Sequence, residues 1–148
     1  MKTRSRSIHQ IVEEQVKKWH LWPDQYLQHL MKVVGAIGKH GRSVLVGRGA
    51  NFILPPERRF RVRVIAPREE MVKRVSEDFR VDLEAARRRV IRTESDRRAF
   101  VRRYFYADIA DPSHYDLVVN TGAVGLDAAA EAVLGALKRK AVSLERAA

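Results

Sequence analysis

The chain has 148 residues, of which 45% are hydrophobic and 32% are charged, the composition of a globular domain. It contains no cysteine, which excludes disulfides and thiolate metal sites, and no apolar run approaches the ~20 residues that span a bilayer. The net charge of +11 favours an anionic partner, whether a nucleotide, a nucleic acid or an acidic membrane face. The basic start, Met1–Ser7, is not followed by the apolar core of a signal peptide, so we expect a cytoplasmic protein.

Two helices are predicted within residues 8–37, where apolar residues recur mostly at helical spacing. Pro23 breaks this run because proline removes a backbone donor and clashes with the preceding turn. We therefore expect the second helix to begin near Pro23 and to end at the glycine-containing stretch Gly38–Gly41. Residues 1–7 and 141–148 are expected to be flexible tails of a single domain, residues 8–140.

Two short strands are predicted next. The apolar run Ser43–Val46 is typical of a buried strand, and it ends in a loop formed by Gly47, Arg48 and Gly49. Residues 60–65 follow a turn at two prolines. Apolar and polar residues alternate at the start of this stretch and its end is apolar, as in a strand that has one solvent-exposed face at its start.

Two helices follow these strands. Pro67 is well placed to open the first, whose inner face would be Met71, Val72, Val75 and Phe79. A long arginine-rich helix comes next in the region 80–106. We expect Asp82 to cap it and a break near residues 93–95.

The last part of the chain predicts a loop over residues 108–114, a third strand over Tyr115–Asn120 and a final helix. The final helix carries one apolar stripe, which comprises Leu126, Ala129, Ala130, Val133, Leu134 and Leu137. Strands separated by helices indicate an α/β fold with a mostly parallel sheet of about three recognisable strands covered by helices.

Glycine-rich stretches are candidates for a phosphate site. Gly35–Ser43 resembles a phosphate loop superficially, but Val33 and His40 stand where that loop needs a glycine and a hydroxyl residue, so a helix end fits better. Gly47-Arg48-Gly49 lies just beyond a predicted strand, where open α/β sheets bind ligands. Arginine there could bind phosphate oxygens, although a tight turn with an exposed arginine explains the tripeptide equally well.

The region 80–106 is the most unusual part of the sequence because it contains eight arginines besides Arg80: Arg87, Arg88, Arg89, Arg92, Arg97, Arg98, Arg102 and Arg103. Converging guanidinium groups need an anion to offset their repulsion. A solvated helix with internal salt bridges is the alternative, and charge pattern alone slightly favours it. The five histidines are scattered without metal-ligand spacing, so no metal site is predicted.

The order of these elements resembles the cytidylate kinase-like family, relatives of the nucleoside monophosphate kinases in the P-loop NTPase superfamily. The matching residues are Val44–Leu54, Ile65–Pro67, Asp96–Arg98 and Asp111–Thr121. The resemblance implies a partial P-loop-kinase-like fold of three layers, in which the arginine-rich helix is a mobile lid.

The resemblance also implies roles for individual residues. Those expected to bind substrate are Gly47, Arg48, Gly49, Asn51, Arg97 and Arg103. The expected catalytic residues, which would neutralise charge between donor and acceptor phosphates, are Arg92, Asp96, Arg98 and Arg102. Gly49 stands where true cytidylate kinases tend to have an acidic residue, so specificity for cytidine does not follow.

The family's first strand and glycine-rich phosphate loop do not occur in this sequence. ATP and Mg²⁺ would therefore bind only if such a loop were supplied from elsewhere. In the kinase fold that strand lies between Val44–Val46 and Val62–Ile65, so its loss leaves a gap of ~9.6 Å that something must fill.

Three hypotheses follow. The first is a protein that is inactive alone and retains an arginine-lined site for a nucleotide or another phosphorylated ligand. The second is an active nucleotide kinase of the CMP type, if an upstream segment, a partner chain or a second protomer supplies the loop. The third is a basic nucleic-acid-binding module. A homodimer or a partner chain could complete the sheet, and no membrane partner is expected.

Overall fold

The computed structural model describes residues 23–147, and its contacts divide the chain into two units, residues 1–33 and residues 34–148, which we describe separately. Helix α2 (Pro23–His40) begins in the first unit and ends in the second. Its bounds confirm the second predicted helix. The first predicted helix and the predicted tail 1–7 lie outside the described residues. In the described part of the first unit, Tyr26, Leu27 and Leu30 are half-buried.

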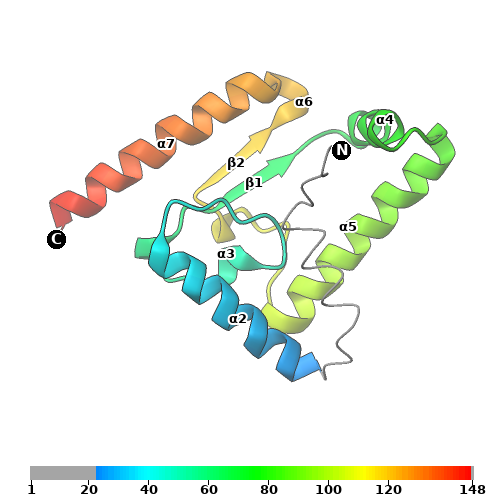
Figure 1. The fold of residues 1–148 in the computed structure, drawn as a ribbon. Helices are drawn as coiled ribbons and strands as arrows, with labels where there is room; N and C mark the ends of the chain where they lie inside the picture. Colours follow the sequence, from blue (N-terminus) through cyan, green and yellow to red (C-terminus); the bar gives the residue numbers. More distant parts are fainter. Residues whose placement is uncertain (1–22, 148) are drawn as a thin grey trace, which may run out of the picture. The chain divides into compact units, whose positions relative to one another are not determined.

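The sheet of the second unit consists of two parallel strands, β1 (Val62–Ile65) and β2 (Leu117–Asn120). Their register places Val62 opposite Leu117 and Ile65 opposite Asn120. Parallel strands need a long crossover connection, which helices α4 and α5 supply here. Figure 1 shows α7 on one side of the strands and α4 and α5 on the other. The α/β class with a parallel sheet covered by helices is confirmed.

The prediction of a strand over Ser43–Val46 was wrong. Residues 41–46 have no helical or strand structure, and the side chains of Val44 and Val46 are 92% and 77% exposed. A buried parallel strand needs neighbouring strands on its hydrogen-bonding edges, and among the described residues β1 and β2 pair only with each other. The apolar run is present, but nothing in the described chain pairs with it.

Two short helices, α3 (Ala50–Ile53) and η1 (Pro56–Arg58), connect this unpaired segment to β1. After β1, Pro67 precedes α4 (Arg68–Phe79), as expected of a proline at a helix start. Helix α5 (Leu83–Phe105) begins at the predicted cap, where the Asp82 carboxylate accepts a hydrogen bond from the backbone N–H of Ala85 at 2.7 Å.

Helices α4 and α5 enclose the main apolar core of the second unit. Val72 of α4 packs with Ala86 and Val90 of α5, and Met71 and Val75 cover them. These residues include three of the four that the sequence placed on the inner face of α4. The fourth, Phe79, is 52% exposed, and its ring instead lies 3.9 Å from the guanidinium carbon of Arg89.

Helix α5 runs without interruption over 23 residues, so the break predicted near residues 93–95 was wrong. Thr93 and Glu94 are half-buried within the helix. Arg92 and Asp96 flank them at a spacing of four residues, with Nε and Oδ2 3.9 Å apart. Opposite charges at this spacing stabilise a helix, which offsets the weak helix propensity of threonine and serine.

The chain then passes through η2 (Pro112–His114) and β2 into two helices, α6 (Thr121–Val124) and α7 (Leu126–Ala147). The predicted apolar stripe of α7 is only partly covered, since Ala129 is buried whereas Leu126 and Leu134 are 59% and 54% exposed. Residues 141–147, expected to form a tail, continue α7. None of the described helices is both long enough and apolar enough to cross a membrane.

Candidate functional site

The loop formed by Gly47, Arg48 and Gly49 has an unusual backbone. All three residues have positive φ angles, of 79°, 55° and 65°. Glycine adopts such angles without steric cost, whereas they are uncommon for an arginine. The carbonyl groups of Gly47 and Gly49 accept hydrogen bonds from the backbone N–H groups of Ala50 and Phe52, at 3.2 and 2.9 Å. The loop is therefore a fixed turn that leads directly into α3.

Gly49 is held against the last turn of α5. The residue is buried, and a Cβ atom at this position would overlap the ring of Phe105. That ring stacks on Phe52 of α3 with a centroid distance of 5.0 Å, and Phe52 in turn contacts His114 of η2. The contact brings the Gly47–Gly49 loop to the carboxyl end of the arginine-rich helix.

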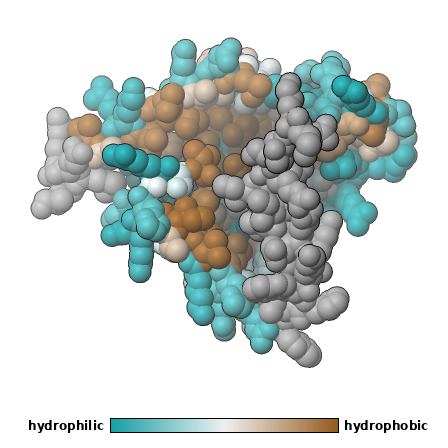
Figure 2. All heavy atoms as spheres, viewed as in Figure 1, coloured by the Kyte–Doolittle hydropathy of each residue, from teal (hydrophilic) through white to brown (hydrophobic). Residues whose placement is uncertain are grey.

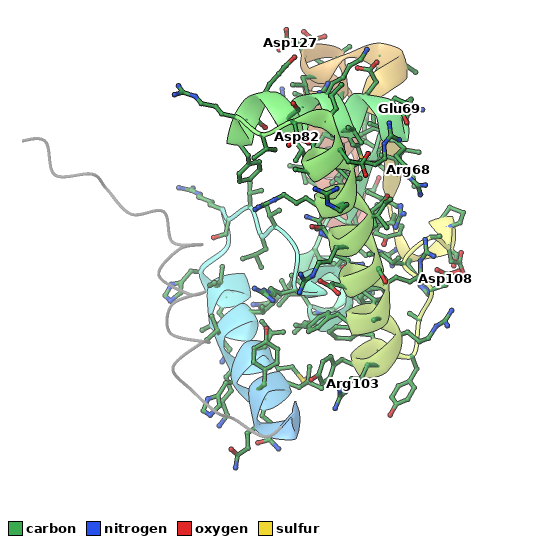
Figure 3. All side chains as sticks on the ribbon, turned by 90° about the vertical axis from the view of Figure 1, so that its right-hand side faces the viewer. Arg68, Glu69, Asp82, Arg103, Asp108 and Asp127 are labelled. Atoms are coloured by element: carbon green, nitrogen blue, oxygen red, sulfur yellow. The ribbon has the colours of Figure 1, made fainter. Side chains whose placement is uncertain are left out.

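The first half of α5 is tied to α4 by ion pairs. The guanidinium of Arg87 donates two hydrogen bonds to the Glu69 carboxylate, at 2.7 and 2.9 Å, and this hydrogen bonding lowers the pKa of Glu69. Arg68 lies 3.6 Å from Glu94. Figure 3 shows Arg68 and Glu69 beside the first half of α5 and Arg103 near its last turn. These ion pairs hold α5 against the start of α4, which follows β1, and the Phe105 contact holds its last turn against the Gly47–Gly49 loop.

The arginines of α5 do not share one face. Arg97 lies on the same face as the buried Val90 and Val101, because it is seven residues from the first and four from the second. Its side chain is nevertheless exposed. By the same geometry Arg98 and Arg102 share a flanking face.

The other predicted residues of α5 lie away from the core. Arg92, Asp96 and Arg103 share the face turned from Val90 and Val101, and the paired side chains of Arg92 and Asp96 are 85% and 74% exposed. The guanidinium carbon of Arg103 lies 5.5 Å from the centroid of the Tyr104 ring. The four residues predicted to be catalytic are thus divided between two faces of the helix.

The stretch Gly35–Ser43 is not a phosphate loop. Gly35 and Gly38 lie within α2, whose last residue is His40. A helical backbone uses its N–H groups within the helix, so they are not free to surround phosphates as those of a glycine-rich loop are. No group of three or more potential metal ligands occurs among residues 23–147.

An open groove of about 870 Å³ lies between residues 42–45, the start of β1 and the second half of α7. Two of the predicted substrate-binding residues, Gly47 and Asn51, line it. The groove also has six basic residues in its lining: Lys39, Arg42, Arg58, Arg59, Arg61 and Lys140. Nothing in the sequence marks them as a group, because they are spread over several elements and no local spacing connects them.

One carboxylate organises part of this basic lining. Asp116 accepts hydrogen bonds from the backbone N–H of Arg61 at 2.7 Å and from its side chain at 3.3 Å, and the ammonium of Lys140 lies 3.2 Å away. Burial by itself would raise the pKa of Asp116, but the hydrogen bonds from Arg61 and Lys140 outweigh it and lower the pKa to about 2. Asp116 therefore stays ionised and offsets part of the positive charge.

Asn51 and Arg59 are hydrogen-bonded neighbours in the lining of the groove. Arg59 Nη1 donates to the carbonyl oxygen of Asn51 at 2.8 Å. Two further donors, Asn51 Nδ2 and Arg59 Nε, are buried without a hydrogen-bond partner among the described residues. Unpaired buried donors are costly, so these two lower the stability of this part of the fold.

Comparison with known proteins identifies the family. The cytidylate kinase-like family model matches residues 1–123, and no curated protein matches the chain. The matched range includes the Gly47–Gly49 loop, both strands and the whole of α5. It covers most of the 148 residues, and the chain therefore belongs to the cytidylate kinase-like family.

Proposed function

We propose that this chain binds a nucleotide, or another phosphorylated ligand, between the Gly47–Gly49 loop and the arginines of α5. The observation that carries the proposal is the packing of Gly49 on Phe105, which fixes the loop beside the end of the arginine-rich helix. Family membership supports a nucleotide as the ligand class. Helix α5 is tied to Arg68 at the start of α4, which follows the carboxyl end of β1, and that end is the edge where parallel sheets bind ligands.

Arg97 is the best candidate for a phosphate contact on α5. It lies on the inner face of the helix yet is exposed, so its guanidinium is accessible on the side of α5 that faces the rest of the unit. Arg98 and Arg102 flank it. Guanidinium groups bind phosphate oxygens in a bidentate manner, and such charge-assisted hydrogen bonds are about twice as strong as neutral ones. Arg48 would contribute from the loop.

We further propose that the 148-residue chain binds this ligand without transferring phosphate by itself. Phosphoryl transfer depends on positioning and on neutralising the donor phosphates, which a glycine-rich loop with its lysine performs in kinases of this superfamily. The sequence has no such loop, and its one superficial match, Gly35–Ser43, is mostly helical.

Calorimetric titration at low salt tests the binding. We expect CMP, CDP, CTP or ATP to bind, and Arg97→Ala to weaken the affinity about tenfold or more, since a hydrogen bond to a charged group contributes about 1.5–3 kcal/mol. Arg139→Ala is the matched control, because Arg139 is also an exposed helical arginine but lies on α7 outside the groove. The proposal fails if no nucleoside mono-, di- or triphosphate binds, or if both variants weaken binding equally.

A coupled ATPase assay tests the second part. We expect no turnover above background with or without nucleoside monophosphates, whereas measurable turnover would make the chain a self-sufficient kinase. The third hypothesis, nucleic-acid binding, gives a different result: RNA or DNA would bind with an affinity that falls steeply with salt yet persists at ~0.1 M.

A further inference from the structure

A row of aromatic contacts connects His114 to the Gly47–Gly49 loop. The imidazole ring lies edge-on to the ring of Phe52, with a centroid distance of 5.3 Å. Phe52 stacks on Phe105, and the Phe105 ring fills the space that a Cβ atom of Gly49 would occupy. Figure 2 shows hydrophobic side chains gathered in the middle of this face, where Figure 1 draws α3. The loop is therefore coupled by packing to a histidine that is distant in the sequence.

Phe52 also holds the loop through its backbone. Its N–H donates to the carbonyl of Gly49 at 2.9 Å, and the N–H of Ala50 donates to the carbonyl of Gly47 at 3.2 Å. The ring and the backbone of Phe52 thus constrain the same turn. A side chain that limits the motion of the Phe52 ring limits the motion of the loop as well.

A carboxylate lies on the other side of the imidazole. Nε2 of His114 is 3.8 Å from Oδ2 of Asp111, the residue that caps η2. The other carboxylate oxygen, Oδ1, accepts a hydrogen bond from the backbone N–H of Ser113 at 2.8 Å. This hydrogen bond and, to a smaller extent, the charge of His114 lower the pKa of Asp111. Asp111 is therefore ionised above about pH 4 and is held in position by its own turn.

Other charged residues belong to the elements around His114. They are Arg48 of the loop, Arg63 of β1, Arg102 and Arg103 of α5, and Asp108 and Asp116 of the connection to β2. Asp108 accepts a hydrogen bond from the N–H of Ala110, and Asp116 is bonded to Arg61. Asp111 is thus the acidic residue that forms an ion pair with His114 in the described chain. The arginines oppose a further positive charge, and Asp111 offsets it.

We propose that His114 is a pH-sensitive positioning residue, which holds the Gly47–Gly49 loop against α5 through Phe52 when its imidazole is protonated and paired with Asp111. Histidine changes its charge between about pH 5 and pH 8. As the pH rises through this range, the imidazole loses its ionic attraction to Asp111. Below about pH 4 the carboxylate is protonated and the pair is lost again. The loop should be held most firmly between these limits.

The consequence for ligands rests on the proposed function, because the loop is one side of the proposed nucleotide site. The effect on the loop itself does not depend on any ligand. The side chains of His114 and Asp111 are 31% and 47% exposed, so solvent screens part of their attraction. An exposed ion pair changes an equilibrium by about two- to fivefold, which sets the size of the expected effect.

Amide hydrogen exchange measures how firmly the loop is held. The N–H groups of Ala50 and Phe52, which are bonded to the loop carbonyls, exchange when the loop opens. After correction for the intrinsic exchange rates, we expect their protection to be about two- to fivefold higher at about pH 5.5 than at about pH 7.5. The N–H of Ala86, bonded to the carbonyl of Asp82 at 2.9 Å, reports on the α4–α5 core instead.

Two variants remove the ion pair in different ways. Asp111→Asn removes the charge, while its amide oxygen can still accept the hydrogen bond from Ser113 and cap η2. His114→Phe removes the titrating group and keeps an aromatic ring against Phe52. We expect both variants to lose the pH dependence of loop protection.

His40→Gln is the matched control, because His40 is an exposed histidine at the end of α2. This variant should keep the full pH dependence at Ala50 and Phe52. At a given pH, the protection of Ala86 should be the same in all three variants as in the unaltered chain.

The affinity for CMP gives a second readout. At about pH 5.5 the unaltered chain should bind CMP about two- to fivefold more tightly than the Asp111→Asn variant, and at about pH 7.5 equally tightly. Titration of the phosphate of CMP cancels in this comparison, because both chains meet the same ligand. If neither chain binds CMP, the proposed function fails, and the exchange measurement still decides the role of His114.

Three results would overturn the role of His114. The first is loop protection that does not change with pH in the unaltered chain. The second is an Asp111→Asn variant that retains the full change, which would assign the pH dependence to another group. The third is an equal loss of protection at Ala86 and at the loop, which would make the ion pair a contribution to general stability.

Discussion

Asp116 is the residue on which the start of the sheet depends. It lies just before β2, pairs with Arg61 just before β1, and also pairs with Lys140 of α7. Its side chain is only 19% exposed, so these interactions are less screened than those of a surface ion pair. The Lys140 ammonium also donates to the carbonyl of Arg59 at 2.9 Å, which extends the network into the groove.

We expect Asp116→Asn to lower the free energy of unfolding at pH 7 by about 1–3 kcal/mol, because two cations would lose their charged acceptor. The folded-state pKa of about 2 lies below the ordinary value of 3.8, so the ionised carboxylate stabilises the fold above pH 4. This contribution is lost as the pH falls from about 4 to about 2. Urea unfolding of both proteins across this range measures it.

The exposed Asp127 at the start of α7 gives the control, since Asp127→Asn makes the same chemical change away from the network. A stability difference between the Asp116 variant and the unaltered chain that stayed constant down to pH 2 would contradict this account.

At the scale of elements, the contact between the Gly47–Gly49 loop and α5 decides whether a site exists. The loop follows an unpaired segment, and Gly49 meets Phe105 where any larger residue would overlap the ring. The left-handed backbone at Gly49 adds a second requirement for glycine. These two constraints connect residues far apart in the sequence.

We expect Gly49→Ala to lower the free energy of unfolding by about 1–3 kcal/mol, because the alanine strains the backbone and overlaps the Phe105 ring. The variant should also bind nucleotide more weakly, because the loop is displaced away from α5. Thermal unfolding and calorimetric titration measure the two effects. Gly135→Ala is the matched control, because nothing lies within 4 Å of its added Cβ in α7. Alanine in a helix interior should instead stabilise the chain by up to about 1 kcal/mol.

A Gly49 variant as stable as the unaltered chain would show that the Phe105 contact does not constrain the loop. Unchanged nucleotide affinity in a destabilised variant would separate the contact from binding.

At the scale of the whole molecule, the net charge of +11 governs the response to anions. General screening reduces the repulsion among cations and depends on ionic strength alone. Binding at the arginines depends on the chemistry of the anion and acts at low concentration, because a ligand that binds only the folded state stabilises it.

We expect about 1 mM tripolyphosphate to raise Tm by at least about 2 °C, the shift that about 1 kcal/mol produces in a chain of this size. Sodium chloride at the same ionic strength should produce a much smaller rise. Differential scanning fluorimetry measures the shift in Tm for each salt. Equal shifts would show that the arginines of α5 bind no particular anion and form only a solvated, salt-bridged surface.

The sequence by itself determined the elements whose causes are local. Pro23 and Pro67 set helix starts, Asp82 caps α5, and alternation identified β1. It also identified the arginine-rich helix and, through resemblance, the family. Capping, proline geometry and periodicity act within a few residues, which is why the sequence could reveal them.

Only the tertiary structure decided which predicted elements acquire partners. The Val44–Val46 run has the composition of a strand, but strand pairing is non-local, and the described chain offers it none. The lining of the basic groove combines residues as far apart in the sequence as Lys39 and Lys140. Which face of α5 is buried decides that Arg92 lies on the side away from the core and Arg98 on a flanking side. Such contacts depend on how segments that are distant in the sequence pack together, and a local sequence pattern does not reveal this packing.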